Sequence, residues 1–211
     1  MFGMESKRVN IAIAGGPCTG KSTLSAYVYA HLKLKEYDYD LILEECRKLK
    51  KEFGTFRTPF ERFYMWRQQE REELRSNAQH GFITDKPLFH YYAQARQFAA
   101  EPRDDMAVRE FFRMCLELNK RYQLIAIPEN PLEIPYKTDQ SRSSKMEISV
   151  ARHKIIRTFV EHTWPEKLLL VHGSLEDRTK QVVEKASCLL SQEGFSPEIN
   201  SPRLGKLDEE L

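Results

Sequence analysis

The chain has 211 residues, of which 41% are hydrophobic and 30% are charged, and its formal net charge is +2. This balance is ordinary for a globular domain with a full core, and the net charge neither requires a nucleic-acid partner nor excludes a local basic groove. No apolar run approaches the length of a bilayer span, and the N-terminus lacks the apolar core of a signal peptide, so we expect a cytoplasmic protein with no membrane partner. The four cysteines lack the spacing of a zinc site, and we expect them to be reduced thiols.

Apolar runs alternate with helical patterns along the chain, which predicts an α/β fold: a five-stranded, mostly parallel sheet with helices on both faces. The predicted strands are 9–14, 40–44, 81–85, 122–127 and 168–171. The predicted helices cover about 22–35, 59–79, a short stretch after 87, 104–121, 148–162 and a last segment capped by Ser174. Residues 1–191 are expected to form one domain, and 192–211, with two Ser-Pro pairs and terminal acids, a mobile tail.

The first strand runs into a phosphate-binding loop of the pattern G-x-x-x-x-G-K-[ST]. In such a loop the backbone N–H groups turn inward around nucleotide phosphates, and the following helix adds its positive N-terminal dipole. We expect the lysine to reach the β- and γ-phosphates and the serine hydroxyl to ligate Mg²⁺. The nucleotide-binding residues predicted here are Gly15, Gly16, Pro17, Cys18, Thr19, Gly20, Lys21, Ser22 and Thr23.

The nucleotide is expected to be ATP. Residues 119–122 begin like the guanine-reading N-K-x-D tetrad, but they lack its acid and lie before the fourth strand instead of after it. The sequence therefore supports a P-loop NTPase that uses ATP and Mg²⁺ as cofactors.

Acidic residues follow two of the predicted strands, at the edge of the sheet where α/β proteins bind ligands. Glu44 and Glu45 end the second strand, and Asp85 ends the third. Phosphoryl transfer uses one carboxylate to hold Mg²⁺ and another to take the proton of the attacking hydroxyl. We assign Asp85 to the metal together with Ser22, although Asp85 as the base, or as a helix cap before Pro87, stays open. Glu44 and Glu45 point to opposite faces of an extended strand, so only one of them can face the site.

Residues 128–147 contain three prolines and many polar residues, and they are predicted to form an irregular lid over the strand ends. A mobile basic lid can supply arginines to the transferring phosphoryl group and exclude water. The candidates are Arg142 in this segment and Arg152 in the helix that follows. The alternative is an ordinary solvated loop.

The helix predicted at 59–79 carries an apolar stripe that turns polar midway, at Arg67, Glu70 and Arg71. The stripe itself consists of Phe60, Phe63, Tyr64, Leu74 and Ala78. A stripe of this kind either lines a cavity or projects into solvent. We favour a wall of the acceptor site, with Arg67 and Arg71 binding substrate together with Arg47, which follows the second strand.

These motifs, in this order, resemble the AAA-type P-loop kinase and ATPase family of the NadR ribosylnicotinamide-kinase domain, which includes phage-type members. The resemblance covers roughly residues 8–190. It rests on G-G-P-x-T-G-K-S-T at 15–23, acid-acid-x-Arg at 44–47, I-T-D-x-x-L-F at 83–89, an Asp139…Arg142 pair, and G-x-x-x-x-R at 173–178.

The resemblance implies that Gly173 and Arg178 flank the adenine and that Asp139 and Arg142 belong to the lid. The chain departs from the family there, because Gln140-Ser141 stands where the family usually has Asp-Gly before its arginines. The identity of the acceptor is therefore left open.

Three functions are compatible with the sequence. The first is an ATP-dependent kinase that phosphorylates a hydroxyl of a small nucleoside or nucleotide-like acceptor. The second is a phage-type kinase of hydroxymethylpyrimidine in DNA, for which the arginines of helix 59–79 argue, although interleaved glutamates weigh against a uniform basic surface. The third is a nucleotide-switched binding protein without an acceptor. No oligomeric state is indicated.

Overall fold

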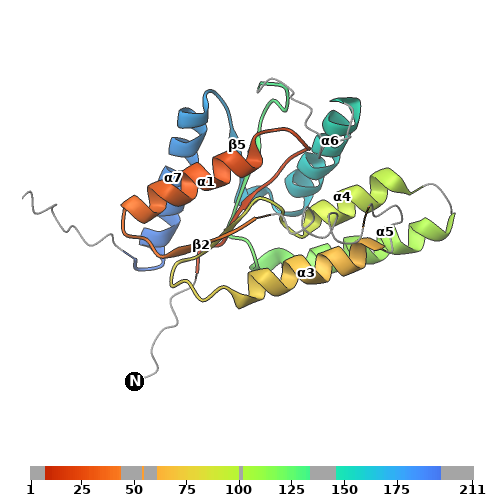
Figure 1. Ribbon diagram of the computed structural model, residues 1–211, viewed down its shortest axis with the longest axis horizontal. Helices are drawn as coiled ribbons and strands as arrows, with labels where there is room; N and C mark the ends of the chain where they lie inside the picture. Colours follow the sequence, from red (N-terminus) through yellow and green to blue (C-terminus); the bar gives the residue numbers. More distant parts are fainter. Residues whose placement is uncertain (1–7, 44–53, 55–60, 100–101, 134–145, 196–211) are drawn as a thin grey trace, which may run out of the picture.

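The computed structural model describes residues 8–43, 54, 61–99, 102–133 and 146–195. Five strands alternate with helices along the chain (Figure 1). The strands are β1 (Ile11–Ile13), β2 (Tyr39–Ile42), β3 (Gly81–Thr84), β4 (Leu124–Pro128) and β5 (Leu168–Val171). The α-helices in this part of the chain are α1 (Lys21–Leu34), α3 (Glu61–Arg75), α4 (Phe89–Phe98), α5 (Pro102–Leu116), α6 (Met146–Thr163) and α7 (Leu175–Gln192), with 3₁₀ turns η1 (Glu117–Lys120) and η2 (Pro165–Lys167).

The strands form one sheet in the order β2-β3-β1-β4-β5, and every neighbouring pair is parallel. The predicted α/β class with a five-stranded sheet is therefore confirmed. Strand β1 lies at the centre, with Ala12 opposite Thr84 of β3 on one side and Ile125 of β4 on the other. Because parallel strands end at the same edge, the residues after β1, β3 and β4 meet there.

Helices cover both faces of the sheet, as predicted (Figure 1). Successive side chains of β1 alternate between the two cores: Ile11 and Ile13 pack with α1 and α7, whereas Ala12 and Ala14 face the aromatic core under α3 to α6. In that second core Phe89 contacts Phe159 and Trp164 at ring separations of 6.0 and 5.9 Å. Among the described residues, no helix combines the length and apolarity needed to cross a bilayer.

Most predicted elements differ from the observed ones only at their ends. The capping box that Ser174 was expected to make with Asp177 is confirmed, since each accepts the other's backbone N–H, at 3.1 and 2.9 Å. The helix predicted to reach residue 121 instead gives way to η1 after Leu116. The fourth strand starts at Leu124 instead of 122, and the buried Tyr122 before it points its hydroxyl toward Glu73.

The buried face of α3 is only partly the predicted one. Tyr64 and Leu74, which the apolar stripe was expected to bury, are 46% and 68% exposed, whereas Met65 and Trp66 are fully buried. The face toward the core also carries three buried polar side chains, Arg62, Gln69 and Glu73. The stripe prediction is confirmed for Phe63, which stacks on Phe111, and for the buried Ala78, but it is wrong for Tyr64 and Leu74. Hydrophobicity alone could not show that the polar groups of this face find partners inside the protein.

Glu73 anchors a buried polar network between α3 and the sheet. Its carboxyl oxygens each lie 3.0 Å from the Tyr122 hydroxyl, and the Arg121 guanidinium is 3.5 Å away. The Tyr122 hydroxyl also accepts the backbone N–H of Leu88 at 2.9 Å. One helical turn earlier, Gln69 donates to the Thr84 hydroxyl at 3.2 Å. The network therefore holds both ends of segment 84–88, which contains Asp85.

Burial raises the pKa of Glu73 from its ordinary 4.5 to about 8, although Arg121 opposes the shift. The native protein then keeps a proton that the unfolded chain loses near pH 4.5. The contribution of Glu73 to the free energy of unfolding is therefore full at low pH. It falls as the pH rises toward 8, by at most about 1.4 kcal/mol per pH unit.

We predict that Glu73→Gln makes the free energy of unfolding fall less steeply between pH 5 and 8, because the amide does not titrate. Urea denaturation at pH 5, 6, 7 and 8 measures this slope. Glu72→Gln is the matched control, since Glu72 lies at the helix surface and pairs with Arg75. Equal slopes in the wild type and Glu73→Gln would contradict the assignment.

Candidate active site

The phosphate loop lies between β1 and α1, at the centre of the sheet edge. Gly20 adopts a left-handed φ of 76° as the N-cap of α1, a conformation that glycine reaches without strain. Cys18 also has a positive φ, of 61°, which is uncommon for a residue with a side chain. The loop is therefore held in its shape by its surroundings and not by glycine alone.

Lys21 and Thr19 both turn back onto the loop. The Lys21 ammonium donates to the Gly16 carbonyl oxygen at 2.6 Å, and the Thr19 hydroxyl donates to the same oxygen at 2.9 Å. These bonds close the loop around its own backbone. A lysine held at this point can exchange the carbonyl for phosphate oxygens without a change in the fold.

Ser22 and Asp85 are brought into direct contact. The Ser22 hydroxyl donates to Asp85 Oδ2, because β1 and β3 are neighbours and their ends lie side by side. Asp85 is 3% exposed, and its Oδ1 has no hydrogen-bond partner among the described residues. A buried carboxylate oxygen without a partner is costly, which points to a cation or a donor supplied by a ligand.

These oxygen donors fit Mg²⁺, which takes few protein ligands and completes its shell with water and phosphate oxygens. Within the described ranges no three His, Cys, Asp or Glu side chains gather into a metal site of their own. A cation at Ser22 and Asp85 would thus depend on nucleotide phosphates for its remaining ligands.

Side chains of α4 and α6 that were not predicted form hydrogen bonds with the backbone of the loop. The Ser149 hydroxyl of α6 donates to the Pro17 carbonyl oxygen. His90 Nε2 and His153 Nδ1 lie 3.3 Å from the backbone nitrogens of Gly15 and Gly16. Single histidines in helical patterns carry no signal in the sequence, so only the tertiary structure could reveal these contacts.

Arg152 lies on α6 beside His153, half-buried. Its Nε donates to Gln97 at 2.6 Å, and its guanidinium carbon lies 5.5 Å from the centre of the Phe98 ring. Arg62 of α3 approaches the same ring at 4.6 Å. Two cations from α3 and α6 thus converge on the end of α4.

Gly173 and Arg178 are joined by a carboxylate that the sequence did not single out. Glu133, which follows β4, accepts the Gly173 N–H at 2.8 Å and pairs with the Arg178 guanidinium. Arg178 is 2% exposed, and its Nε has no partner among the described residues. The ion pair fastens the start of the predicted lid to the end of β5 and to α7.

Four of the predicted site residues, Glu44, Glu45, Arg47 and Arg142, lie outside the described residues, as does Asp139. Arg67 and Arg71 are described and lie on the outer face of α3, opposite the Gln69 side that contacts β3. Arg67 is 73% exposed and pairs with Glu70. Both arginines thus face away from β3, and their role in a substrate-binding wall of the acceptor site stays a prediction.

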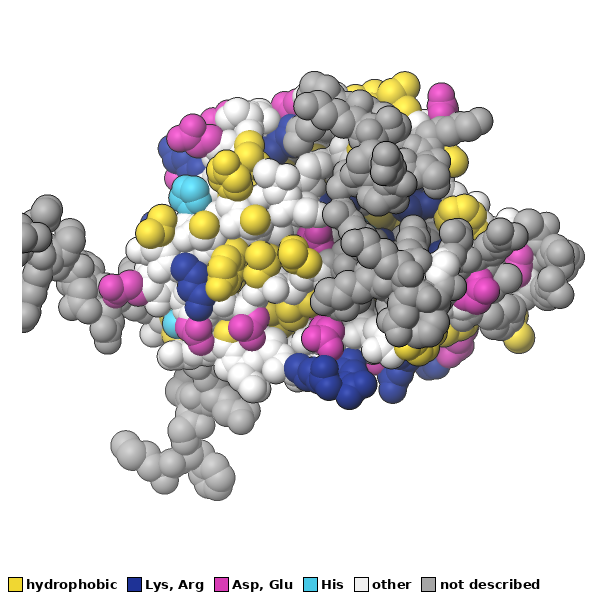
Figure 2. Space-filling model, viewed as in Figure 1, with side chains coloured by type: hydrophobic (Ala, Val, Ile, Leu, Met, Phe, Trp, Pro, Cys, Tyr) yellow, Lys and Arg dark blue, Asp and Glu magenta, His cyan; other side chains and the backbone are white. Residues whose placement is uncertain are grey.

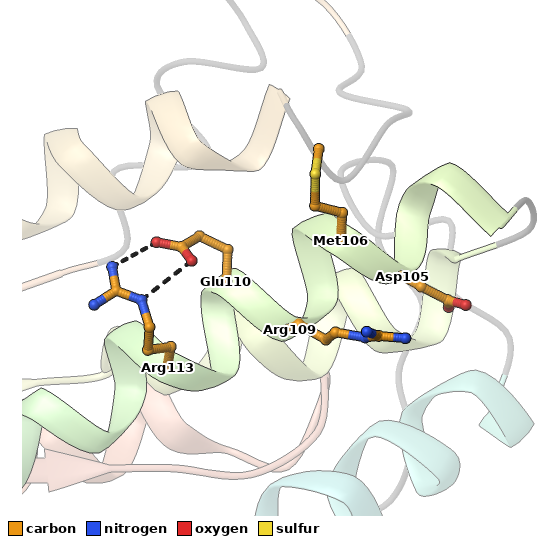
Figure 3. A pocket seen from close by; sticks show the side chains of 5 residues that line it. All are labelled: Asp105, Met106, Arg109, Glu110 and Arg113. Atoms are coloured by element: carbon orange, nitrogen blue, oxygen red, sulfur yellow. Dashed lines mark hydrogen bonds and ion pairs between the residues drawn. The ribbon is translucent and has the colours of Figure 1, made fainter.

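Figure 2 shows Lys and Arg side chains gathered along the lower edge of the molecule, where α3 runs in Figure 1. A shallow hollow of about 360 Å³ lies there, lined by Arg67, Gln68, Glu70, Arg71, Leu74 and Arg75. A second one, of about 410 Å³, lies on the outer face of α5 between Met106, Arg109 and the Glu110–Arg113 ion pair (Figure 3). The described residues that line each hollow come from a single helix, and none of them belongs to the phosphate loop.

The family model described as an AAA domain matches residues 10–178, which is most of the chain. No curated protein sequence matches this chain. Two solved structures of NadR are similar in fold: the complex with NR has a TM-score of 0.63 and 14% identity, over 93% of this chain and 55% of that one. The complex with NAD and AMP-PNP has a TM-score of 0.65 and 14% identity, over 91% and 51%.

The deoxyadenosine kinase of M. mycoides, solved with products dCMP and a flexible dCDP, has a TM-score of 0.60 and 15% identity, over 86% of this chain and all of that one. The chain thus spans about half the length of NadR and the full length of the deoxyadenosine kinase. At this identity the likeness shows a shared fold alone.

We predict that Glu133→Gln lowers the free energy of unfolding by about 1–3 kcal/mol, because the buried Arg178 guanidinium loses its charged partner. The amide oxygen can still accept the Gly173 N–H, so the loss isolates the charge. Urea denaturation at neutral pH measures it. Glu129→Gln is the control, since Glu129 is exposed in the same segment; an equal effect there would contradict the prediction.

Proposed function

Because this chain belongs to the AAA domain family, we propose that it is a kinase that transfers the γ-phosphoryl group of ATP to a hydroxyl group of a nucleoside or a nucleotide-like small molecule. The observation that carries the proposal is the contact between the Ser22 hydroxyl and the buried Asp85 carboxylate beside the phosphate loop. NR and dCMP, which are named for two of the similar folds, support a small acceptor, and AMP-PNP, an ATP analogue named for another, supports ATP as the donor.

In this proposal the loop binds the phosphates through its backbone N–H groups and the start of α1. Lys21 exchanges the Gly16 carbonyl for the β- and γ-phosphate oxygens. Ser22 and Asp85 hold Mg²⁺, which when bound neutralises charge on the phosphate oxygens during transfer. Gly173 and Arg178, at the end of β5, flank the adenine.

The contact with Ser22 supports Asp85 as a metal ligand more than as the base. The proton of the attacking hydroxyl then goes to Glu44 or Glu45, which follow β2 in the sequence. Arg152, with Arg142 of the lid, acts on the transferring phosphoryl group. The acceptor lies between α3 and the ends of β2 and β3, beyond the buried contact of Gln69 with Thr84.

A DNA acceptor has less support. A phosphate backbone is bound by cations that are available at the surface. On α3 the Arg67 and Arg75 guanidiniums instead lie 2.5 and 2.9 Å from carboxylates of their own helix, Glu70 and Glu72. These pairs reduce the positive field that would attract nucleic acid.

The proposal is tested by incubating the protein with labelled ATP and Mg²⁺ against a panel of nucleosides, nucleotides and hydroxymethylated DNA. We expect transfer to a small nucleoside-like acceptor. Lys21→Ala should lower the rate about 10²–10⁴-fold with the fold intact, because the transferring phosphoryl group loses its clamp.

Circular dichroism and thermal unfolding provide the control for folding of Lys21→Ala. Transfer to DNA alone would favour the second function. ATP binding without transfer to any member of the panel would favour a nucleotide-switched binding protein. Near-normal turnover by folded Lys21→Ala would remove the phosphate loop from the mechanism.

We further predict that Asp85→Asn weakens the activation of transfer by Mg²⁺ more than it weakens ATP binding measured with excess EDTA. The amide keeps the size of the side chain but loses the charge that a divalent cation requires. Mg²⁺ titrations of the wild type and the variant give the comparison, with Asp105→Asn on the exposed side of α5 as control. An unchanged Mg²⁺ titration would contradict the assignment of Asp85 to the metal, and Asp85 is not a helix cap either, since the N-cap of α4 is Leu88.

A further inference from the structure

We propose that His90 and His153 are positioning residues of the phosphate loop, each accepting one backbone N–H of the Gly15–Gly16 pair so that the loop is already shaped for a phosphate chain. The inference rests on the proposed function only in naming ATP as the ligand. The hydrogen bonds between the two histidines and the glycine N–H groups are present without a nucleotide.

The two histidines reach the loop from different helices. His90 stands near the start of α4 and His153 in the middle of α6, and both side chains are buried, at 2% and 4% exposure. His90 Nε2 is 3.3 Å from the Gly15 nitrogen, and His153 Nδ1 is 3.3 Å from the Gly16 nitrogen. Two neighbouring peptides of one strand–helix loop are thus held by two independent elements.

Both glycines are buried, so their N–H groups have no access to bulk water as an alternative acceptor. A buried N–H left without an acceptor destabilises the arrangement by about 1–3 kcal/mol. An imidazole accepts only at a nitrogen that carries no proton. The geometry therefore requires neutral rings, with the proton on Nδ1 of His90 and on Nε2 of His153.

The surroundings keep both rings neutral. Burial, followed by the charges of Lys86 and Lys21, holds the pKa of His90 well below its usual value. Burial, followed by Lys21 and Arg157, lowers the pKa of His153 to about 4. Both acceptors are consequently in place throughout the physiological pH range, including when Lys21 lies in the loop.

The Gly16 peptide shows what the arrangement achieves. Its carbonyl oxygen is bound by Lys21 and Thr19, while its N–H is bound by His153. When Lys21 leaves the carbonyl for phosphate, Thr19 and His153 still fix both sides of the peptide. The lysine can then change partner without a rearrangement of the loop, and ATP binding does not include the cost of ordering it.

Ser149 adds a second contact from the same face of α6. It lies one helical turn before His153, and its hydroxyl donates to the Pro17 carbonyl oxygen. A Cβ built on Gly16 would overlap the Ser149 backbone carbonyl, so the backbones of α6 and the loop are in direct contact at this glycine. Helix α6 therefore determines the path of the loop at residues 16 and 17, and α4 determines it at residue 15.

The test uses amide side chains that imitate one imidazole nitrogen each. The amide oxygen of asparagine lies at the position of Nδ1, and that of glutamine at the position of Nε2. His153→Asn and His90→Gln therefore keep the acceptor, whereas the exchanged pair, His153→Gln and His90→Asn, removes it with the same chemical groups. Binding of Mg²⁺-ATP is measured by calorimetry at pH 7.5, with thermal unfolding of each variant recorded in parallel.

We expect His153→Asn and His90→Gln to bind Mg²⁺-ATP within about threefold of the wild type. His153→Gln and His90→Asn should bind roughly 5- to 100-fold more weakly, the effect of one unsatisfied N–H. At each position, the difference in Mg²⁺-ATP affinity between the two variants should be larger than their difference in thermal stability accounts for. If the two variants at each position bind equally, whether strongly or weakly, the acceptor role is refuted.

Amide hydrogen exchange of Gly15 and Gly16 separates this proposal from the proposed function. The Gly16 amide should stay protected in His153→Asn and exchange faster in His153→Gln, without any nucleotide present. If the wild type fails to bind ATP but shows this pattern, the kinase proposal fails and the histidine contacts stand. If protection is the same in both variants, the histidine proposal fails whatever the activity.

Discussion

The parallel pairing of β1 with β3 is the constraint on which the site depends. It sets Ala12 opposite Thr84, so that the residues after each strand emerge at the same edge of the sheet. Ser22 and Asp85, which are 63 positions apart in the chain, then form a hydrogen bond. The hydroxyl and the carboxylate that we propose to hold Mg²⁺ thus meet because of how the two strands pair.

The two faces of the sheet contribute differently to that edge. On one face α1 and α7 pack against an aliphatic core, where Ile11 and Ile13 lie. The other face carries α3 to α6, and its aromatic core is bordered by buried polar side chains that reach toward the loop and toward Asp85. The first face anchors the helix that follows the loop, and the second holds the loop and the carboxylate in place.

Several buried polar side chains lie on the face of the sheet that α3 to α6 cover, and they differ in their hydrogen-bond partners and in their protonation. Glu73 finds Tyr122 and Arg121, and burial raises its pKa to about 8. His90 and His153 find backbone N–H groups and are held neutral. Such groups contribute little net stability when satisfied and cost much when they are not, so they specify one arrangement of the helices around the loop.

From the sequence alone, the fold class, the positions of the strands and the phosphate loop could be derived, because each depends on local patterns: apolar runs, glycine spacing and the Ser174 cap. The face of α3 could not, because Arg62, Gln69 and Glu73 look like solvent-facing residues until their partners on α4, β3 and beside β4 are known. For the same reason the pattern could not show that Arg67 and Arg71 lie on the outer face of α3. Which groups accept the N–H of Gly15 and Gly16, and which carboxylate pairs with Arg178, was decided by the packing of α4, α6 and the segment after β4, since such contacts join residues that no spacing in the sequence connects.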